Sequence, residues 1–190
     1  MIRRLRPFVS DDSATTLVEF TLIMPLLFLM TFGIAEFGFI FYQFQSLDAA
    51  TAIAARMAAT RGPVITGIPD CGVGVTGPAG AFCNQLAGSK TWTPVVCVGA
   101  SPGGNCNVAL MNRIVTEMQR VYPQMTLANL NIAYGPSGLG FMGLGKPVPT
   151  VTVTVTGVTA NFIALGAFGL TNIAMPPFTT TLTGEDLSGT

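Results

Sequence analysis

The sequence predicts an α+β protein in which a long, membrane-spanning N-terminal helix leads into a second helix and a small antiparallel sheet. Three observations lead to this fold class. The chain is almost continuously apolar from Leu17 to Tyr42. Residues 107–123 place apolar side chains at three- and four-residue steps, which is the period of a helix. Within residues 148–158, valines at 151, 153 and 155 alternate with threonines at 152, 154 and 156, which is the period of a strand with one buried face.

The composition indicates a membrane protein and argues against an enzyme. Of the 190 residues, 49% are hydrophobic and only 9% are charged, and the mean hydropathy is +0.57, which is unusual for a soluble domain. The net charge is zero and the longest basic group is Arg3, Arg4 and Arg6, so we expect no nucleic-acid partner. The absence of histidine removes the commonest general base and the histidine-dependent nucleophile pairs and metal sites. We therefore predict a non-enzymatic protein without cofactor or metal.

The apolar run is long enough to cross a bilayer. At ~1.5 Å per residue, its roughly 26 residues measure ~39 Å, against a hydrocarbon core of ~30 Å. The three arginines lie just before the run, so the positive-inside rule places the N-terminus in the cytoplasm and everything after Tyr42 outside. This predicts a single-pass protein of the cytoplasmic (inner) membrane, in contact with lipid over about 17–42.

The helix is expected to continue beyond the membrane. Leu47, Ala50 and Ala54 fall at helical steps after the apolar run, and Gly62-Pro63 provides a stop signal. We therefore predict one helix over 15–61. Pro25 lies inside it and removes a backbone hydrogen bond, which predicts a kink or a locally unwound turn.

The stretch TTLVEFTLIMPLL and the later GIAEFG resemble the N-terminal signature of TadE-like pseudopilins. These are minor pilins of the tight-adherence (Tad/Flp) pilus machinery, a branch of the type IV pilin superfamily. Precursors of this kind carry a short basic leader, removed by a prepilin peptidase at a position that makes glutamate the fifth mature residue. The resemblance implies a cytoplasmic leader over 1–14 and a cut between Ala14 and Thr15, with Ala14 where the family has glycine. Glu19 and Phe20 would then be the fifth and sixth mature residues.

Two interpretations of Glu19 follow. The resemblance implies that its carboxylate pairs with the new α-amino group at Thr15 of a neighbouring subunit, which would set the axial register between packed helices. Alternatively, Glu19 lies solvated in the cytoplasmic headgroup region without a role. The implied partners are the prepilin peptidase, other pilins and pseudopilins, and the Tad inner-membrane assembly platform.

Glu36 is the second acid of the apolar run. It lies 17 residues after Glu19, which is ~25 Å along the axis and about 100° around it. We expect it to approach the outer interface on a different face of the helix, as an interfacial or helix-packing residue.

The four cysteines predict disulfide bonds outside the cytoplasm. They are Cys71, Cys83, Cys97 and Cys106, and none forms a C-x-x-C pair of the kind that zinc sites use. Two disulfides are therefore expected, with three pairings open. They would restrain the Gly/Pro-rich segment 62–106, which we interpret as a long loop.

The outer part of the chain, 107–190, is predicted to be α+β. A helix is expected from about Asn107 to Pro123, followed by strands around 127–135, 148–158 and 178–186. Between the last two strands, residues 161–175 read NFIALGAFGLTNIAM, an apolar stretch too short and polar for a confident span. It predicts a buried loop, a short helix or an exposed docking patch. The helix and strands follow from periodicity, whereas their arrangement as a pilin-like domain follows from the resemblance.

Taken together, the residues and the resemblance predict a minor pilin or pseudopilin. It would be processed after Ala14 and take part in assembly or initiation of a Tad-type pilus, a machinery of adhesion, surface attachment or secretion-like transport. The alternative is an uncleaved, single-pass membrane anchor that carries an extracytoplasmic binding domain. Retention of the leader and indifference to Glu19 would favour that alternative.

Overall fold

The computed structural model describes residues 12–68, 80–82, 85–86, 90–141 and 148–184 and confirms the α+β class. Its helices are α2 (Asp12–Thr60) and α3 (Val108–Met118), with short 3-10 helices η1 (Leu127–Asn129) and η2 (Leu165–Phe168). Its strands are β1 (Gln85–Leu86), β2 (Lys90–Thr91), β3 (Val95–Val98), β4 (Leu130–Leu139), β5 (Val148–Val155), β6 (Thr159–Asn161), β7 (Asn172–Ala174) and β8 (Phe178–Thr183). The chain divides into two compact units, 1–42 with 160–173 and 43–159 with 174–190, which we call the anchor unit and the sheet unit.

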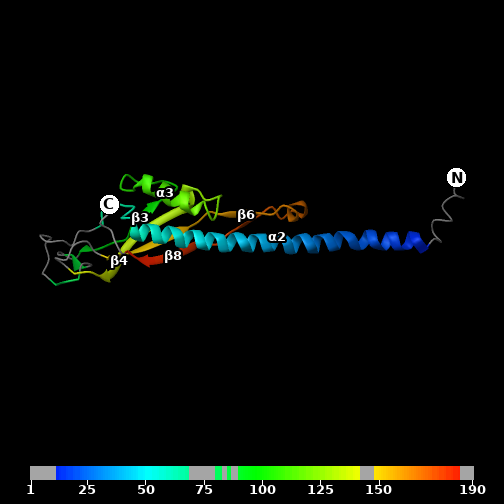
Figure 1. Cartoon of the computed structure of the whole chain (residues 1–190), viewed down its shortest axis with the longest axis horizontal. Coiled ribbons are helices and arrows are strands. Elements are labelled where there is room, and N and C mark those ends of the chain that lie inside the picture. Colours follow the sequence, from blue (N-terminus) through cyan, green and yellow to red (C-terminus); the bar gives the residue numbers. More distant parts are fainter. Residues whose placement is uncertain (1–11, 69–79, 83–84, 87–89, 142–147, 185–190) are drawn as a thin grey trace. The chain divides into compact units, whose positions relative to one another are not determined.

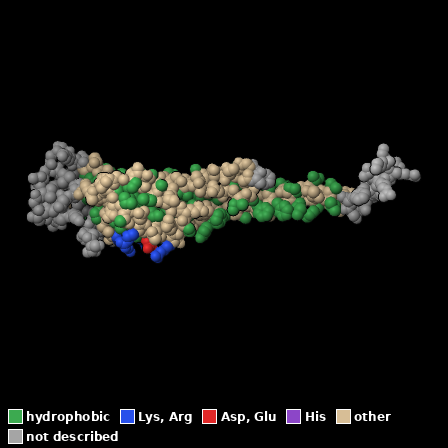
Figure 2. All heavy atoms as spheres, turned by 90° about the horizontal axis from the view of Figure 1, so that it is seen from above, with side chains coloured by type: hydrophobic (Ala, Val, Ile, Leu, Met, Phe, Trp, Pro, Cys, Tyr) green, Lys and Arg blue, Asp and Glu red, His purple; other side chains and the backbone are tan. Residues whose placement is uncertain are grey.

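In the anchor unit, α2 exposes its apolar side chains. The helix is continuous over 49 residues with Pro25 inside it (Figure 1). Large hydrophobic side chains before Tyr42 point outward, and Figure 2 shows them as a run along this part of the helix. The most exposed are Leu17, Leu22 and Ile34, at 68%, 74% and 76%. A surface of this kind is unstable in water and suits lipid.

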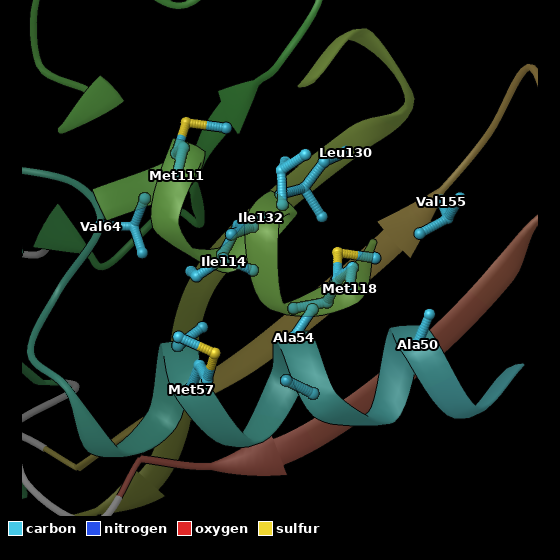
Figure 3. Packing of buried hydrophobic residues seen from close by; sticks show 14 of the residues in the cluster. Ala50, Ala54, Met57, Val64, Met111, Ile114, Met118, Leu130, Ile132 and Val155 are labelled. Atoms are coloured by element: carbon cyan, nitrogen blue, oxygen red, sulfur yellow. The ribbon is translucent and has the colours of Figure 1, made fainter. Parts of the chain in front are cut away.

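In the sheet unit, the same helix turns alanines towards a core. Ala50 and Ala54 are fully buried, four residues apart on one face. Figure 3 shows Ala50, Ala54 and Met57 on the side of α2 that is turned towards α3, with Met118 of α3 near Ala54. Because alanine has the smallest apolar side chain, α2 approaches its neighbours closely here. The α3 helix begins with Asn107, whose Oδ1 accepts the Leu110 N–H at 3.1 Å.

The central sheet is antiparallel, in the order β3-β4-β5-β8 (Figure 1). Strand β5 has the predicted alternation, with Val151, Val153 and Val155 fully buried. Its threonines lie on the opposite face, where Thr152 and Thr181 place their Oγ1 atoms 3.2 Å apart. The sheet therefore buries an aliphatic face and presents a hydroxyl-rich one.

Several elements differ from the sequence predictions. Helix α3 ends at Met118 rather than near Pro123. Strand β4 begins at Leu130, because residues 127–129 form a 3-10 turn before it. Strand β3 lies within the Gly/Pro-rich segment and pairs with β4, although its four residues are too few to show a period. The apolar stretch 161–175 includes a short helix, one of the predicted forms, and strands β6 and β7 flank it as a two-stranded sheet. Pairing with a neighbour, rather than local propensity, defines such short strands.

A disulfide joins Cys97 in β3 to Cys106, just before α3. Next to it, the Asn107 N–H donates to the Val64 carbonyl at 2.7 Å, so the end of the first helix and the start of the second are tied together. The structure thus shows one of the predicted disulfides, between Cys97 and Cys106. Cys71 and Cys83 lie outside the described residues.

Candidate functional site

The predicted processing and assembly residues lie at the start of α2. The helix begins at Asp12, so the bond between Ala14 and Thr15 lies within its first turn. Thr15, Glu19 and Phe20 are exposed. Because Thr15 and Glu19 are four residues apart, they lie on the same face of the helix, about one turn from each other. This geometry leaves the carboxylate of Glu19 open to a neighbouring helix.

The apolar part of α2 satisfies its hydroxyl groups internally. The Thr21 hydroxyl donates to the Leu17 carbonyl at 2.7 Å, and the Thr31 hydroxyl donates to the Leu27 carbonyl at 3.0 Å. Back-bonding of this kind to the carbonyl four residues earlier is the usual solution for threonine within an apolar helix. The two threonines therefore do not prevent this part of α2 from lying in lipid.

A groove follows one face of α2 in the anchor unit. Pro25, Phe28, Leu29 and Phe32 recur at three- and four-residue steps, and the same progression reaches Glu36. Together with residues 164 and 165, the first four line a hollow of about 300 Å³ with almost purely apolar walls. Pro25 thus lies at a place where a second segment of the chain packs beside the helix.

Glu36 accepts hydrogen bonds from three consecutive backbone N–H groups. The Ala164 N–H donates to Oε1 at 2.6 Å, and the Leu165 N–H donates to Oε2 at 2.9 Å. The Ile163 N–H also donates to Oε1. Next to these bonds, the rings of Phe37 and Phe162 meet edge to face with centroids 5.8 Å apart. We call Glu36 and the N–H groups of residues 163–165 the Glu36 clamp.

The Glu36 clamp pairs backbone N–H donors at a helix start with a carboxylate acceptor. The N–H groups at the start of η2 have no partner within that helix, since the first turn of any helix leaves its donors unpaired. A carboxylate is a strong acceptor and is favoured at such a helix start. Glu36 is therefore a packing residue within its own chain, joined to a segment 127 to 129 residues further along.

The sequence predicts that Glu36 is an interfacial or helix-packing residue, but it does not reveal the partner of the carboxylate. Backbone N–H groups leave no signature in a sequence. A usable signal was the stretch 161–175, which is apolar and uncharged yet holds two glycines at which a chain can turn. The structure uses Gly169 in this way, with a φ of 91° at the C-terminal end of η2.

Within the described residues, one helix is long and apolar enough to cross a membrane. It is the part of α2 from Thr15 to Thr60, with a most apolar window of mean hydropathy 2.1 and no share of that window buried. In the same described part of the chain, no three His, Cys, Asp or Glu residues lie together as a metal site would require.

Comparison with known proteins finds a family match for the first part of the chain. Residues 14–56 match the family model described as TadE-like protein. No curated protein and no solved structure matches the chain. The match begins at Ala14 and ends at Arg56, so it lies entirely within α2. The resemblance drawn from the residues is thereby confirmed, and the long helix of this protein is a TadE-like segment.

Proposed function

We propose that this protein is a minor pilin or pseudopilin that takes part in assembly or initiation of a Tad-type pilus. The TadE-like match links the chain to Tad pilus proteins and is the single observation that carries the proposal. It starts at Ala14, the residue before the expected cut, and includes Glu19. An apolar helix of membrane-spanning length and an α+β fold after it support the same function.

In this proposal, α2 first holds the subunit in the inner membrane, with the sheet unit outside. Prepilin peptidase removes residues 1–14 and leaves a free α-amino group on Thr15. The exposed carboxylate of Glu19 then pairs with that amine on a neighbouring subunit. In hydrocarbon, both charges are costly unless they meet, so the pair favours one axial register between adjacent helices.

The first test is the N-terminal sequence and intact mass of the protein from membranes, with and without the cognate prepilin peptidase. We expect a chain that starts at Thr15 only when the peptidase is present. A chain that keeps Arg3, Arg4 and Arg6 under both conditions would contradict processing and favour the alternative of an uncleaved membrane anchor with an extracytoplasmic binding domain.

The second test is the role of Glu19. Glu19→Gln preserves size and removes the charge, so we expect it to abolish piliation and co-purification with other pilins while processing continues. Asp48→Asn is the matched control, because Asp48 is an exposed acid on the same helix beyond the apolar run. Unchanged piliation in Glu19→Gln, as in Asp48→Asn, would show that Glu19 has no part in assembly.

A further inference from the structure

The segment that forms β6, η2 and β7 has the surface of a lipid-facing element. Between Lys146 and Glu185 the chain contains no charged residue. Near the tip of this segment, Ile163 is 87% exposed and Leu170 is 53% exposed. We call residues 159–174 the apolar hairpin; Figure 1 shows it running beside α2. Isolated exposed apolar residues are common, but a charge-free hairpin tip beside an apolar helix is not.

A non-helical segment in lipid needs acceptors for its backbone donors, and several donors near the tip of the hairpin have them. The Phe162 N–H donates to the Thr171 carbonyl at 3.1 Å, and the Leu170 N–H donates to the Leu165 carbonyl at 3.2 Å. The N–H groups of 163–165, which a turn would normally offer to water, bind the Glu36 carboxylate instead. Unpaired N–H groups are not tolerated in hydrocarbon, so the Glu36 clamp removes the principal obstacle to insertion.

The depth of the Glu36 clamp agrees with the outer boundary of the membrane. From Leu17 to Glu36 the helix rises ~29 Å at ~1.5 Å per residue, close to the ~30 Å of the hydrocarbon core. Ala164 and Leu165 line the groove that contains Phe32, which lies one turn further in. The tip of the hairpin therefore lies just inside the outer edge of the span that α2 defines.

We propose that the apolar hairpin inserts its tip into the outer leaflet of the membrane beside α2 and that the Glu36 clamp holds it there. The occupant of its exposed surface is lipid, and the contact continues the lipid-facing surface of α2. This inference rests on the membrane anchorage in the proposed function. It gives the protein a second contact with the bilayer and gives Glu36 a specific task.

Depth-dependent quenching of tryptophan fluorescence tests the insertion on the full chain. The protein has one tryptophan, so Trp92→Phe provides a silent background. Ile163→Trp reports on the hairpin, Phe39→Trp on α2, and Val96→Trp on the exposed side of β3. Each variant is reconstituted in phosphatidylcholine vesicles with bromines at shallow or deep acyl positions. We expect Ile163→Trp to be quenched severalfold more than Val96→Trp, and more strongly by shallow bromines.

The controls distinguish a failure of hairpin insertion from a failure of the membrane anchorage by α2 on which it rests. Quenching of Phe39→Trp without quenching of Ile163→Trp would overturn the insertion and leave the anchor intact. If Phe39→Trp also escaped quenching, α2 would not be in the membrane, and both proposals would fail. A blue-shifted Ile163→Trp emission without quenching would mean that another protein surface, such as a second copy, covers the tip.

The Glu36 clamp has its own test in the Ile163→Trp background. Glu36→Ala removes all three acceptor contacts, and Glu36→Gln keeps the size but leaves one acceptor oxygen and adds a donor. We expect loss of most of the hairpin quenching in the first variant and partial loss in the second. Asp48→Asn should leave quenching unchanged. Full quenching in Glu36→Ala would overturn the role given to Glu36, and the Phe39→Trp signal in that variant checks that the helix is still inserted.

Discussion

The hydroxyl group of Tyr134 ties the end of α2 to the chain that follows it. In the sheet unit, this hydroxyl donates to the Ala58 carbonyl at 2.9 Å and accepts the Val64 N–H at 3.2 Å. The Ala58 carbonyl belongs to the last turn of α2, where carbonyl groups lack helical donors. Tyr134 is fully buried, so water cannot replace the hydroxyl. We therefore predict that Tyr134→Phe leaves two buried backbone groups without this partner.

The expected cost follows from those two groups. A buried backbone donor or acceptor that loses its partner costs about 1–3 kcal/mol, whereas the ring of the phenylalanine keeps the apolar contacts. One of the two groups can recover part of its bonding by a small shift, so we expect Tyr134→Phe to lower the free energy of unfolding of the sheet unit by about 2–4 kcal/mol.

Urea denaturation of the full chain in detergent micelles measures this difference. Trp92 is 6% exposed and lies in the sheet unit, so its fluorescence reports on unfolding there. Tyr122→Phe is the matched control, because within the described ranges the Tyr122 hydroxyl makes one long contact, of 3.4 Å, with Gln124 Oε1. We expect the control to lose less than about 1 kcal/mol. A Tyr134→Phe variant as stable as the control would refute the assignment of the two backbone bonds to this hydroxyl.

Three further predictions concern the sheet unit. Burial raises the pKa of Tyr134 from 10 to about 12, so the folded state holds this proton more tightly than the unfolded state. Stability should therefore be full below pH 10 and fall by up to about 3 kcal/mol as the pH rises from 10 to 12. The double variant Cys97→Ala and Cys106→Ala removes a disulfide with a sequence separation of 9. This should lower the free energy of unfolding, measured by urea denaturation, by about 2–3 kcal/mol. Gly99→Ala should destabilise the fold by at least about 1–3 kcal/mol by the same assay, because its Cβ would lie 1.8 Å from the Leu127 carbonyl oxygen.

For each of these three predictions, a specific result would contradict it. Tyr134→Phe should lose the alkaline fall seen between pH 10 and 12, and a fall that persists in that variant would assign the effect to other groups. An unchanged urea midpoint in the double cysteine variant would contradict a stabilising disulfide. Gly104→Ala is the control for Gly99→Ala, since a Cβ at Gly104 would meet nothing within 4 Å. Equal stability of the two glycine variants would contradict the close approach.

The elements that the sequence predicted are those in which one residue pattern persists over several turns or pleats. The long apolar run predicted α2, whose expected end at residue 61 lies one residue beyond its last helical residue, Thr60. The spacing of Met111, Ile114 and Met118 gave α3, and these side chains are buried as expected. In β5 the alternation of valine and threonine identified the buried face. In each case the local preference and the tertiary environment agree.

The elements that the sequence missed depend on partners far along the chain. Strand β3 is fixed by pairing with β4, which brings Cys97 opposite Ile132, and four residues carry too little pattern to show this in advance. The partners of Glu36 were hidden for the same reason, because its hydrogen bonds go to backbone atoms of 163–165. A carboxylate within an apolar helix indicates that some partner exists, but backbone donors do not reveal their position in the sequence.

The TadE-like match extends beyond the apolar run of α2 into the part of the helix that packs in the sheet unit. The matched region, 14–56, contains the exposed apolar run and also Ala50 and Ala54, which are fully buried in the sheet unit. A simple anchor needs only about 20 apolar residues and makes no demand for small side chains beyond them. Replacing either alanine with a larger residue would force apart the packing around α2. The same helix is therefore both long and apolar enough to cross a membrane and, in its later turns, a core element of the sheet unit.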